Sequence, residues 1–169
     1  MGHVVEHIGG NISDIYLPLS NPVQALITSE VRAQWKFARN QPVHLVEANS
    51  SAMRAMTKAL KHGNNLLLFI DEVKDNTVQS PRLGRQYPHR GNLWFAARLA
   101  ARFNVDILPI HIEPAGISRY RAIIEPSLSP SSCAEKNTEK AEVLANQIDQ
   151  ILTLWIKKNP EHWYYLPMF

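Results

Sequence analysis

The 169-residue sequence predicts an α/β fold in which a mainly parallel sheet is flanked by helices. Short apolar runs of strand length alternate along the chain with segments whose apolar residues recur at helical spacing. One run, residues 66–70, is apolar at every position, which is typical of a strand covered on both faces. A chain of this length is expected to form one domain.

The first strand is expected over residues 11–17, and a helix follows it. Asn21 is suited to cap that helix through its side-chain oxygen, and Pro22 to occupy the first turn, where its missing N–H has no cost. Apolar residues at helical spacing extend the helix to about Ala38. These residues are Val23, Leu26, Ile27 and Val31. Residues 42–46 are expected to form the next strand.

A second helix is expected to begin at a cap supplied by Asn49 or Ser50. It ends at Gly63, because glycine adopts the left-handed conformation that commonly follows a helix. The residues expected on its inward face are Met53, Met56 and Leu60. The run 66–70 follows as a buried strand, and residues 71–90 as a long polar loop.

The second half of the chain begins with a predicted helix over residues 92–103. A strand over residues 105–112 contains Pro109, which favours a position at a strand end or a sheet edge because proline cannot donate a backbone hydrogen bond. Residues 120–124 are expected to form another strand. Residues 125–136 are rich in proline and serine and are expected to form a loop.

The last helix is predicted over residues 138–158. Its apolar stripe consists of Ala141, Leu144, Ala145, Ile148, Leu152 and Trp155. Acidic residues cluster near its start, and Lys157 and Lys158 lie at its end, which is the distribution that the helix dipole favours.

The composition limits the classes of function. A formal net charge of +3 is mildly basic, which suits an anionic membrane surface or an acidic partner and does not indicate nucleic acid. A lone Cys133 forms no internal disulfide, and no Cys/His cluster predicts a zinc site, so a reducing cytoplasmic setting is expected. No apolar run approaches the ~20 residues of a membrane-spanning helix, so any membrane association is expected to be peripheral.

A group of acids follows the apolar run. Asp71, Glu72 and Asp75 would lie at the carboxyl end of a strand, where ligands gather in α/β sheets. The acids could bind a cation, orient a partner, or simply form a solvated turn. A metal-dependent enzyme is therefore one of the hypotheses that the sequence leaves open.

The segment that follows is basic. Arg82, Arg85 and Arg90 lie among glycines before the predicted helix 92–103. Guanidinium groups and the free N–H groups of a helix start both suit phosphate or carboxylate, so this loop is a candidate anion site. The alternative is a solvated basic loop.

Helix 92–103 presents Trp94, Arg98 and Arg102 at four-residue spacing. An indole with two cations on one face could contact a lipid surface, with the ring at headgroup level. The same pattern also fits an ordinary exposed helix face.

Several segments, taken in order, resemble the bacterial lipid A (lauroyl/myristoyl) acyltransferases. The last helix is followed by the ending Pro160-Glu161-His162-Trp163-Tyr164-Tyr165. Earlier segments are Tyr16-Leu17-Pro18-Leu19-Ser20-Asn21-Pro22 with Arg32, then Leu60-Lys61-His62-Gly63, then the run ending in Asp71-Glu72, then residues 100–109. Glu72 replaces the usual Gln, and residues 81–85 replace an aromatic Phe-Phe-Gly loop. The resemblance covers nearly the whole chain and implies the C-terminal part of a glycerolipid acyltransferase-like sandwich.

The resemblance implies that a His general base and an acid five residues later are required to activate the acceptor hydroxyl. None of the 7 histidines has an acid at that spacing; His3 and His7, for example, lead to Ile8 and Ile12. We therefore expect no catalytic residue in this chain. We also expect that the family's N-terminal membrane helix and catalytic segment are missing, so that the chain is truncated.

The function implied by the resemblance is transfer of a fatty acyl group from acyl carrier protein or acyl-coenzyme A to a glycolipid hydroxyl, in lipid A and lipopolysaccharide biosynthesis. The substrate-binding candidates are Arg32, Asp71, Glu72, Arg82, Arg85 and Arg90, with no metal and no cofactor. The expected location is the cytoplasmic face of the bacterial inner membrane. The alternative is a non-catalytic module that binds anionic lipid or acyl carrier protein.

Overall fold

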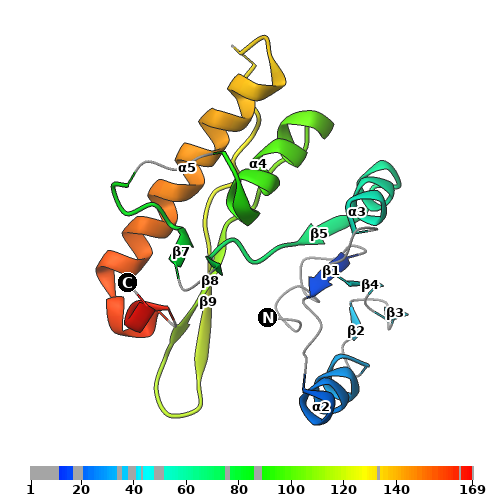
Figure 1. Cartoon of the computed structure of the whole chain (residues 1–169), viewed down its shortest axis with the longest axis vertical. Coiled ribbons are helices and arrows are strands. Elements are labelled where there is room, and N and C mark those ends of the chain that lie inside the picture. Colours follow the sequence, from blue (N-terminus) through cyan, green and yellow to red (C-terminus); the bar gives the residue numbers. More distant parts are fainter. Residues whose placement is uncertain are drawn as a thin grey trace. The chain divides into compact units, whose positions relative to one another are not determined.

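The computed structural model describes residues 12–16, 21–33, 36–37, 41–42, 44–47, 52–74, 77–85, 89–132, 134–163 and 165–168 (Figure 1). Only the backbone is considered at residues 12–16, 31–33, 36–37, 41–42, 44–47 and 168. The chain forms two compact units, Met1–Leu68 and Phe69–Phe169, and each is described by itself.

The first unit contains a three-stranded parallel sheet in the order β4-β1-β5. Its strands are β1 (Ile12–Tyr16), β4 (His44–Glu47) and β5 (Asn65–Leu67). The register places Asp14 of β1 between Leu45 and Leu67. A separate antiparallel pair joins β2 (Lys36–Phe37) to β3 (Gln41–Pro42).

Helix α2 (Pro22–Ala33) begins as the sequence predicts. The Asn21 Oδ1 atom accepts hydrogen bonds from the backbone N–H groups of Val23 (3.0 Å) and Gln24 (3.2 Å), which satisfies two donors of the first turn. The predicted extension to about Ala38 is wrong. Residues 36–37 pair with β3 instead, so tertiary hydrogen bonding overrides the helical periodicity of the sequence.

Helix α3 (Ala52–Lys61) ends at Gly63, as predicted. Gly63 has a φ of +74°, and the Asn64 N–H donates to the Ala59 carbonyl oxygen over 3.0 Å, which completes a Schellman motif. The predicted inward face is partly wrong. Met56 is buried, but Met53 is 49% exposed, because the buried face is completed by alanines at positions 52 and 59.

The apolar run 66–70 is not the buried strand that the sequence predicts. Strand β5 stops at Leu67, none of the five residues is buried, and Phe69 is 51% exposed. Strand β5 lies at the edge of its sheet, and the intermediate or exposed side chains of the run show that it is not covered on both faces.

The core of the second unit lies between α4 (Gly91–Phe103) and α5 (Asn137–Lys158), which run side by side in Figure 1. Both helices are confirmed to within one residue of their predicted bounds. Small side chains at the contact let the two helices approach closely. The buried cluster consists of Leu93, Ala97, Ala100, Ala101, Ala141, Leu144, Ala145 and Ile148.

Two antiparallel hairpins complete the second unit. One joins β6 (Glu72–Lys74) to β7 (Thr77–Ser80), within the segment predicted as a polar loop. The other joins β8 (Ile110–Pro114) to β9 (Tyr120–Ile124). Strand β9 is confirmed. Strand β8 begins after Pro109 rather than at residue 105, as expected for a residue that cannot donate to the ladder.

The chain is of the α/β class, but the prediction of a mainly parallel sheet is not supported. Among the described strands, three lie in the parallel sheet and the others form antiparallel pairs. Two short 3₁₀ helices, η1 (Pro160–His162) and η2 (Leu166–Met168), follow α5. No helix in the described part of the chain is both long enough and apolar enough to span a membrane.

Candidate functional site

The structure brings together Asp71 and the aromatic ending of the chain. Burial raises the pKa of Asp71 above its ordinary value, while hydrogen bonds from its own backbone and from the Trp163 side chain oppose that shift. Trp163 is buried against Val78, Leu152 and Ile156. Asp71 is therefore half-buried beside a packed aromatic side chain and is not part of a solvated turn.

Glu72 supports the start of α4. Its Oε2 atom accepts a hydrogen bond of 2.6 Å from the Asn92 backbone N–H, and a negative charge at a helix N-terminus is favourable. A Cβ atom added at Gly91, where φ is +85°, would lie 2.6 Å from the same oxygen. The Glu72 carboxylate is thus engaged by the helix. Asp75 lies outside the described residues, and no group of three metal-ligating side chains occurs among those that are described.

Arg82 joins its loop to α5. Its backbone N–H donates to Asp149 Oδ1 over 2.7 Å, and its Nε atom lies 3.4 Å from Asp149 Oδ2. The guanidinium group also donates to the Asn146 side-chain oxygen. Asp149 is buried, so Arg82 neutralises a carboxylate that would otherwise be costly to bury.

Arg85 is used within the loop in a similar way. Its guanidinium group donates to the carbonyl oxygens of Val78 (3.1 Å), Pro81 (3.3 Å) and Arg82 (3.1 Å). Arg90 is different, because it is exposed at the N-cap position of α4 and forms no ion pair within the described residues. At Arg32, only the backbone is considered, at the end of α2. Arg82 and Arg85 therefore brace the basic loop through internal hydrogen bonds, whereas Arg90 faces solvent without an ion pair in the described part of the chain.

On α4, where Trp94, Arg98 and Arg102 follow at four-residue spacing, the tryptophan side chain packs inward. Trp94 is half-buried against the α4–α5 core and stacks on His89, with ring centroids 4.2 Å apart. Arg98 and Arg102 are exposed, and Arg102 lies 5.7 Å from the centroid of the Phe103 ring. This arrangement agrees with the ordinary exposed helix face, because the indole that would contact lipid packs inward.

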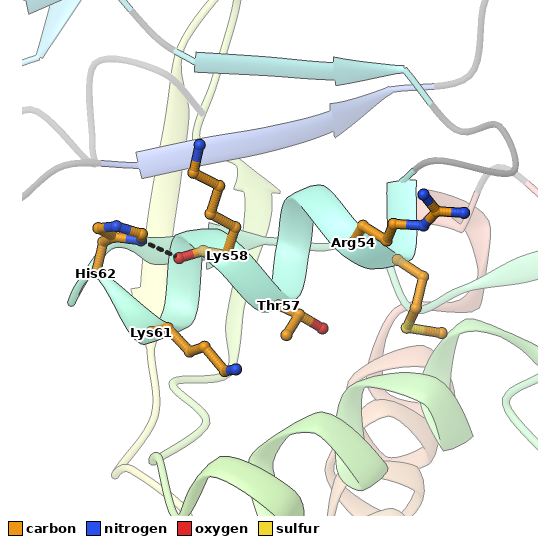
Figure 2. A pocket seen from close by; sticks show the side chains of 6 residues that line it. Arg54, Thr57, Lys58, Lys61 and His62 are labelled. Atoms are coloured by element: carbon orange, nitrogen blue, oxygen red, sulfur yellow. Dashed lines mark hydrogen bonds between the residues drawn. The ribbon is translucent and has the colours of Figure 1, made fainter.

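A second basic face, which was not predicted from the sequence, lies on α3. An open hollow on this helix is lined by Met53, Arg54, Thr57, Lys58, Lys61 and His62 (Figure 2). The three Arg and Lys side chains are exposed and form no ion pair within the described residues. The signal in the sequence was their spacing over positions 54, 58 and 61, on one face of a helix that contains no acid.

Three His–acid pairs lie within 4 Å among the described residues, namely His89–Glu142, His111–Glu113 and His162–Glu161, and none has the five-residue spacing. Only His111–Glu113 forms a hydrogen bond. His111 Nε2 donates to Glu113 Oε1 over 3.0 Å, and this hydrogen bond lowers the pKa of Glu113, with Lys158 adding to the effect. The Nδ1 atom, which would have to act as the base, is buried and has no hydrogen-bond partner among the described residues. The His111 ring also packs against the Trp155 ring in a tilted arrangement. The pair therefore does not present a base to a substrate.

The fold and these surfaces define an α/β protein with exposed basic residues and with a half-buried carboxyl, Asp71, beside Trp163 near the end of the chain. The chain belongs to the bacterial lipid A biosynthesis acyltransferases, because the model of that family matches residues 28–167, which is most of its length. The match confirms the family that the ordered segments resemble. No curated protein matches the sequence.

Proposed function

We propose that this chain takes part in the transfer of a fatty acyl group from acyl carrier protein or acyl-coenzyme A to a glycolipid hydroxyl. The match to the lipid A biosynthesis acyltransferases over residues 28–167 carries the proposal. The family as a whole implies an acyl donor and a lipid acceptor. The particular donor and acceptor, and peripheral association with the cytoplasmic face of the inner membrane, belong to the proposal.

Within this proposal the chain supplies binding surfaces and scaffold and does not supply the general base. No histidine has an acid five residues later, and the His111–Glu113 pair has its free nitrogen buried. Removal of a general base typically lowers a rate by ~10²–10⁴. The 169 residues are therefore expected to show little transfer unaided.

The residues proposed to bind substrate divide into two groups. Asp71, Glu72, Arg82 and Arg85 shape the site through internal hydrogen bonds, and Arg90 faces solvent, where it is free to contact an anion. The basic face of α3, in the first unit, separately offers three exposed cations that form no ion pair within the described residues. Exposed cations attract phosphate and carboxylate groups most strongly at low salt. Arg32 stays a candidate from the resemblance, as does the single acyltransferase-like domain.

The second candidate function is a non-catalytic module that binds acyl carrier protein or anionic lipid. The exposed α3 face favours it, because such a surface needs no base. One experiment separates the two functions. The purified chain is mixed with acyl carrier protein carrying a labelled fatty acid and with a detergent-dispersed glycolipid, and both binding and transfer are followed.

Binding without transfer supports the module. Transfer that appears only when a separate polypeptide with a His-x₄-acid motif is added supports the acyltransferase role and locates the base outside these residues. Robust transfer by the chain unaided contradicts the conclusion that it lacks a base. Absence of both binding and transfer under all conditions contradicts both functions.

A further inference from the structure

The β8–β9 hairpin carries a structured tip at residues 115–119. The Ala115 N–H donates to the Arg119 carbonyl oxygen over 2.8 Å, and the Arg119 N–H donates to the Gly116 carbonyl oxygen over 3.3 Å. Gly116 has a φ of +118° and Ser118 a φ of +55°, so both residues adopt turn conformations that fix the direction of the loop. The side chains at the tip are therefore presented by an ordered turn.

The base of the hairpin is held against α5. His111 packs against Trp155 in a tilted arrangement with ring centroids 3.9 Å apart, and the Trp155 indole donates to Glu125 over 3.1 Å. Lys158 Nζ lies 3.9 Å from Glu113 Oε1. Figure 1 shows the loop of the hairpin extending away from α4 and α5. The base of the hairpin is therefore anchored on α5, and the tip projects from it.

The tip and the first two residues of β9, which are included in the tip from here on, combine apolar, aromatic and basic side chains that are exposed to solvent. Ile117 is 96% exposed and Tyr120 is 74% exposed, and Arg119 and Arg121 are also exposed. No acidic residue occurs between positions 114 and 124, and the nearest acid, Glu113, already contacts His111 and Lys158. The surface that the tip offers is therefore both amphipathic and cationic.

We propose that this tip inserts into the interface of an anionic membrane. Ile117 would enter the boundary of the acyl chains, and Tyr120 would lie at headgroup level, where amphipathic rings are favoured. Arg119 and Arg121 would contact lipid phosphates, each strengthening binding by about fivefold near an anionic surface. The inference rests on the proposed function, which requires a lipid acceptor, and it names the surface by which the protein approaches that lipid.

The size and charge of the tip favour a membrane over a protein partner. A specific protein interface buries about 800 Å² on each partner, which a projecting turn of a few residues does not supply. A second copy of the chain would bring two cationic tips together without an acid between them. Insertion of one isoleucine and one tyrosine into lipid requires neither a large interface nor an acidic residue, because the favourable free energy grows with each apolar side chain that leaves water.

The experiment uses the full chain and vesicles that contain no acyl donor. Co-sedimentation is measured with phosphatidylcholine vesicles and with vesicles that also contain phosphatidylglycerol. The double variant Ile117→Ser/Tyr120→Ser should lower partition into the anionic vesicles by at least about tenfold, because each buried apolar side chain contributes that order of stabilisation. Arg119→Gln/Arg121→Gln should remove the preference for anionic lipid.

Leu154→Ser provides the matched control, because Leu154 is an apolar residue of α5, outside the hairpin, that is 67% exposed. This control should bind vesicles like the parent, and circular dichroism should show that all variants are folded. The proposal is overturned if the parent binds neither vesicle, if the tip variant binds as well as the parent, or if Leu154→Ser loses as much binding. None of these outcomes decides the proposed function, because acyl transfer and carrier binding are measured in the separate assay described above.

Discussion

Gly91→Ala offers a direct test of the contact between Glu72 and the start of α4. The substitution places a Cβ atom 2.6 Å from Glu72 Oε2, at a residue whose φ is +85°. Two costs follow. A side chain in the left-handed region costs roughly 1–2 kcal/mol. The carboxylate must also move away from the Asn92 N–H, and loss of such a cap costs ~0.5–2 kcal/mol.

The two costs can be separated because the chain contains a matched glycine. Gly84 has a φ of +91° and no atom within 4 Å of an added Cβ, so Gly84→Ala should carry the conformational cost alone. Gly91→Ala should therefore destabilise the second unit by about 1.5–4 kcal/mol in total. This loss should exceed that of Gly84→Ala by the contribution of the hydrogen bond between Glu72 and the Asn92 N–H. Glu72→Ala measures that cap independently.

The assay is urea unfolding followed by tryptophan fluorescence, with the free energy of unfolding taken from the midpoint and slope. Both single substitutions remove the hydrogen bond from Glu72 to the start of α4, and the double variant Glu72→Ala/Gly91→Ala can lose it only once. The double variant should therefore be less destabilised than the sum of the two single variants, by ~0.5–2 kcal/mol. Strict additivity would refute the contact. Equal destabilisation by Gly91→Ala and Gly84→Ala would show that the Glu72 carboxylate does not stabilise the start of α4.

Three further predictions concern charged groups. Arg82→Ala should lower the free energy of unfolding by ~1–3 kcal/mol in chemical denaturation, because the buried Asp149 carboxylate of α5 loses a partner. Unchanged stability together with weakened anion binding would instead show that Arg82 binds the ligand. Burial raises the pKa of Asp71 above 3.8, so this carboxyl favours folding at low pH and its contribution is lost as the pH rises through the raised value. Asp71→Asn should therefore flatten the dependence of the unfolding free energy on pH above 3.8, and an unaltered pH profile would contradict the effect of burial. Arg54→Gln/Lys58→Gln should weaken binding of acyl carrier protein several-fold, more at low salt than at high salt, whereas the control Lys157→Gln on α5 should not weaken it. Equal binding by the parent and both variants would place the anion site elsewhere.

The helices of the second unit could be predicted because their signals are local. The stripe of α5 repeats over 22 residues, and its alanines and leucines match a buried face without reference to any other part of the chain. The N-cap of α2 was equally local, since Asn21 contacts residues two and three positions later. Such elements need little information from distant residues, and their bounds were correspondingly close.

Strand coverage depends on neighbours that the sequence does not identify. The run 66–70 has the composition of a central strand but contributes only β5, at the edge of its sheet. The β6–β7 hairpin was missed for the opposite reason, because its strands are short and mostly polar. A weak signal was present, since Val73 and Val78 pair across the hairpin and Asp75-Asn76, two residues that favour turns, lie between the strands in the sequence.

The same limit explains which candidate site residues had to be reinterpreted. A sequence shows that a side chain is charged but not whether a partner meets it, and the partners of Glu72 and Arg82 lie 20 and 67 positions along the chain. Each of these charges is half-buried and therefore requires a partner, whereas Arg54, Lys58 and Arg90 remain in water and do not. Binding of an acidic carrier or an anionic lipid should use the second group, because a cation already committed to an internal carboxylate must break that pair before it can meet a ligand.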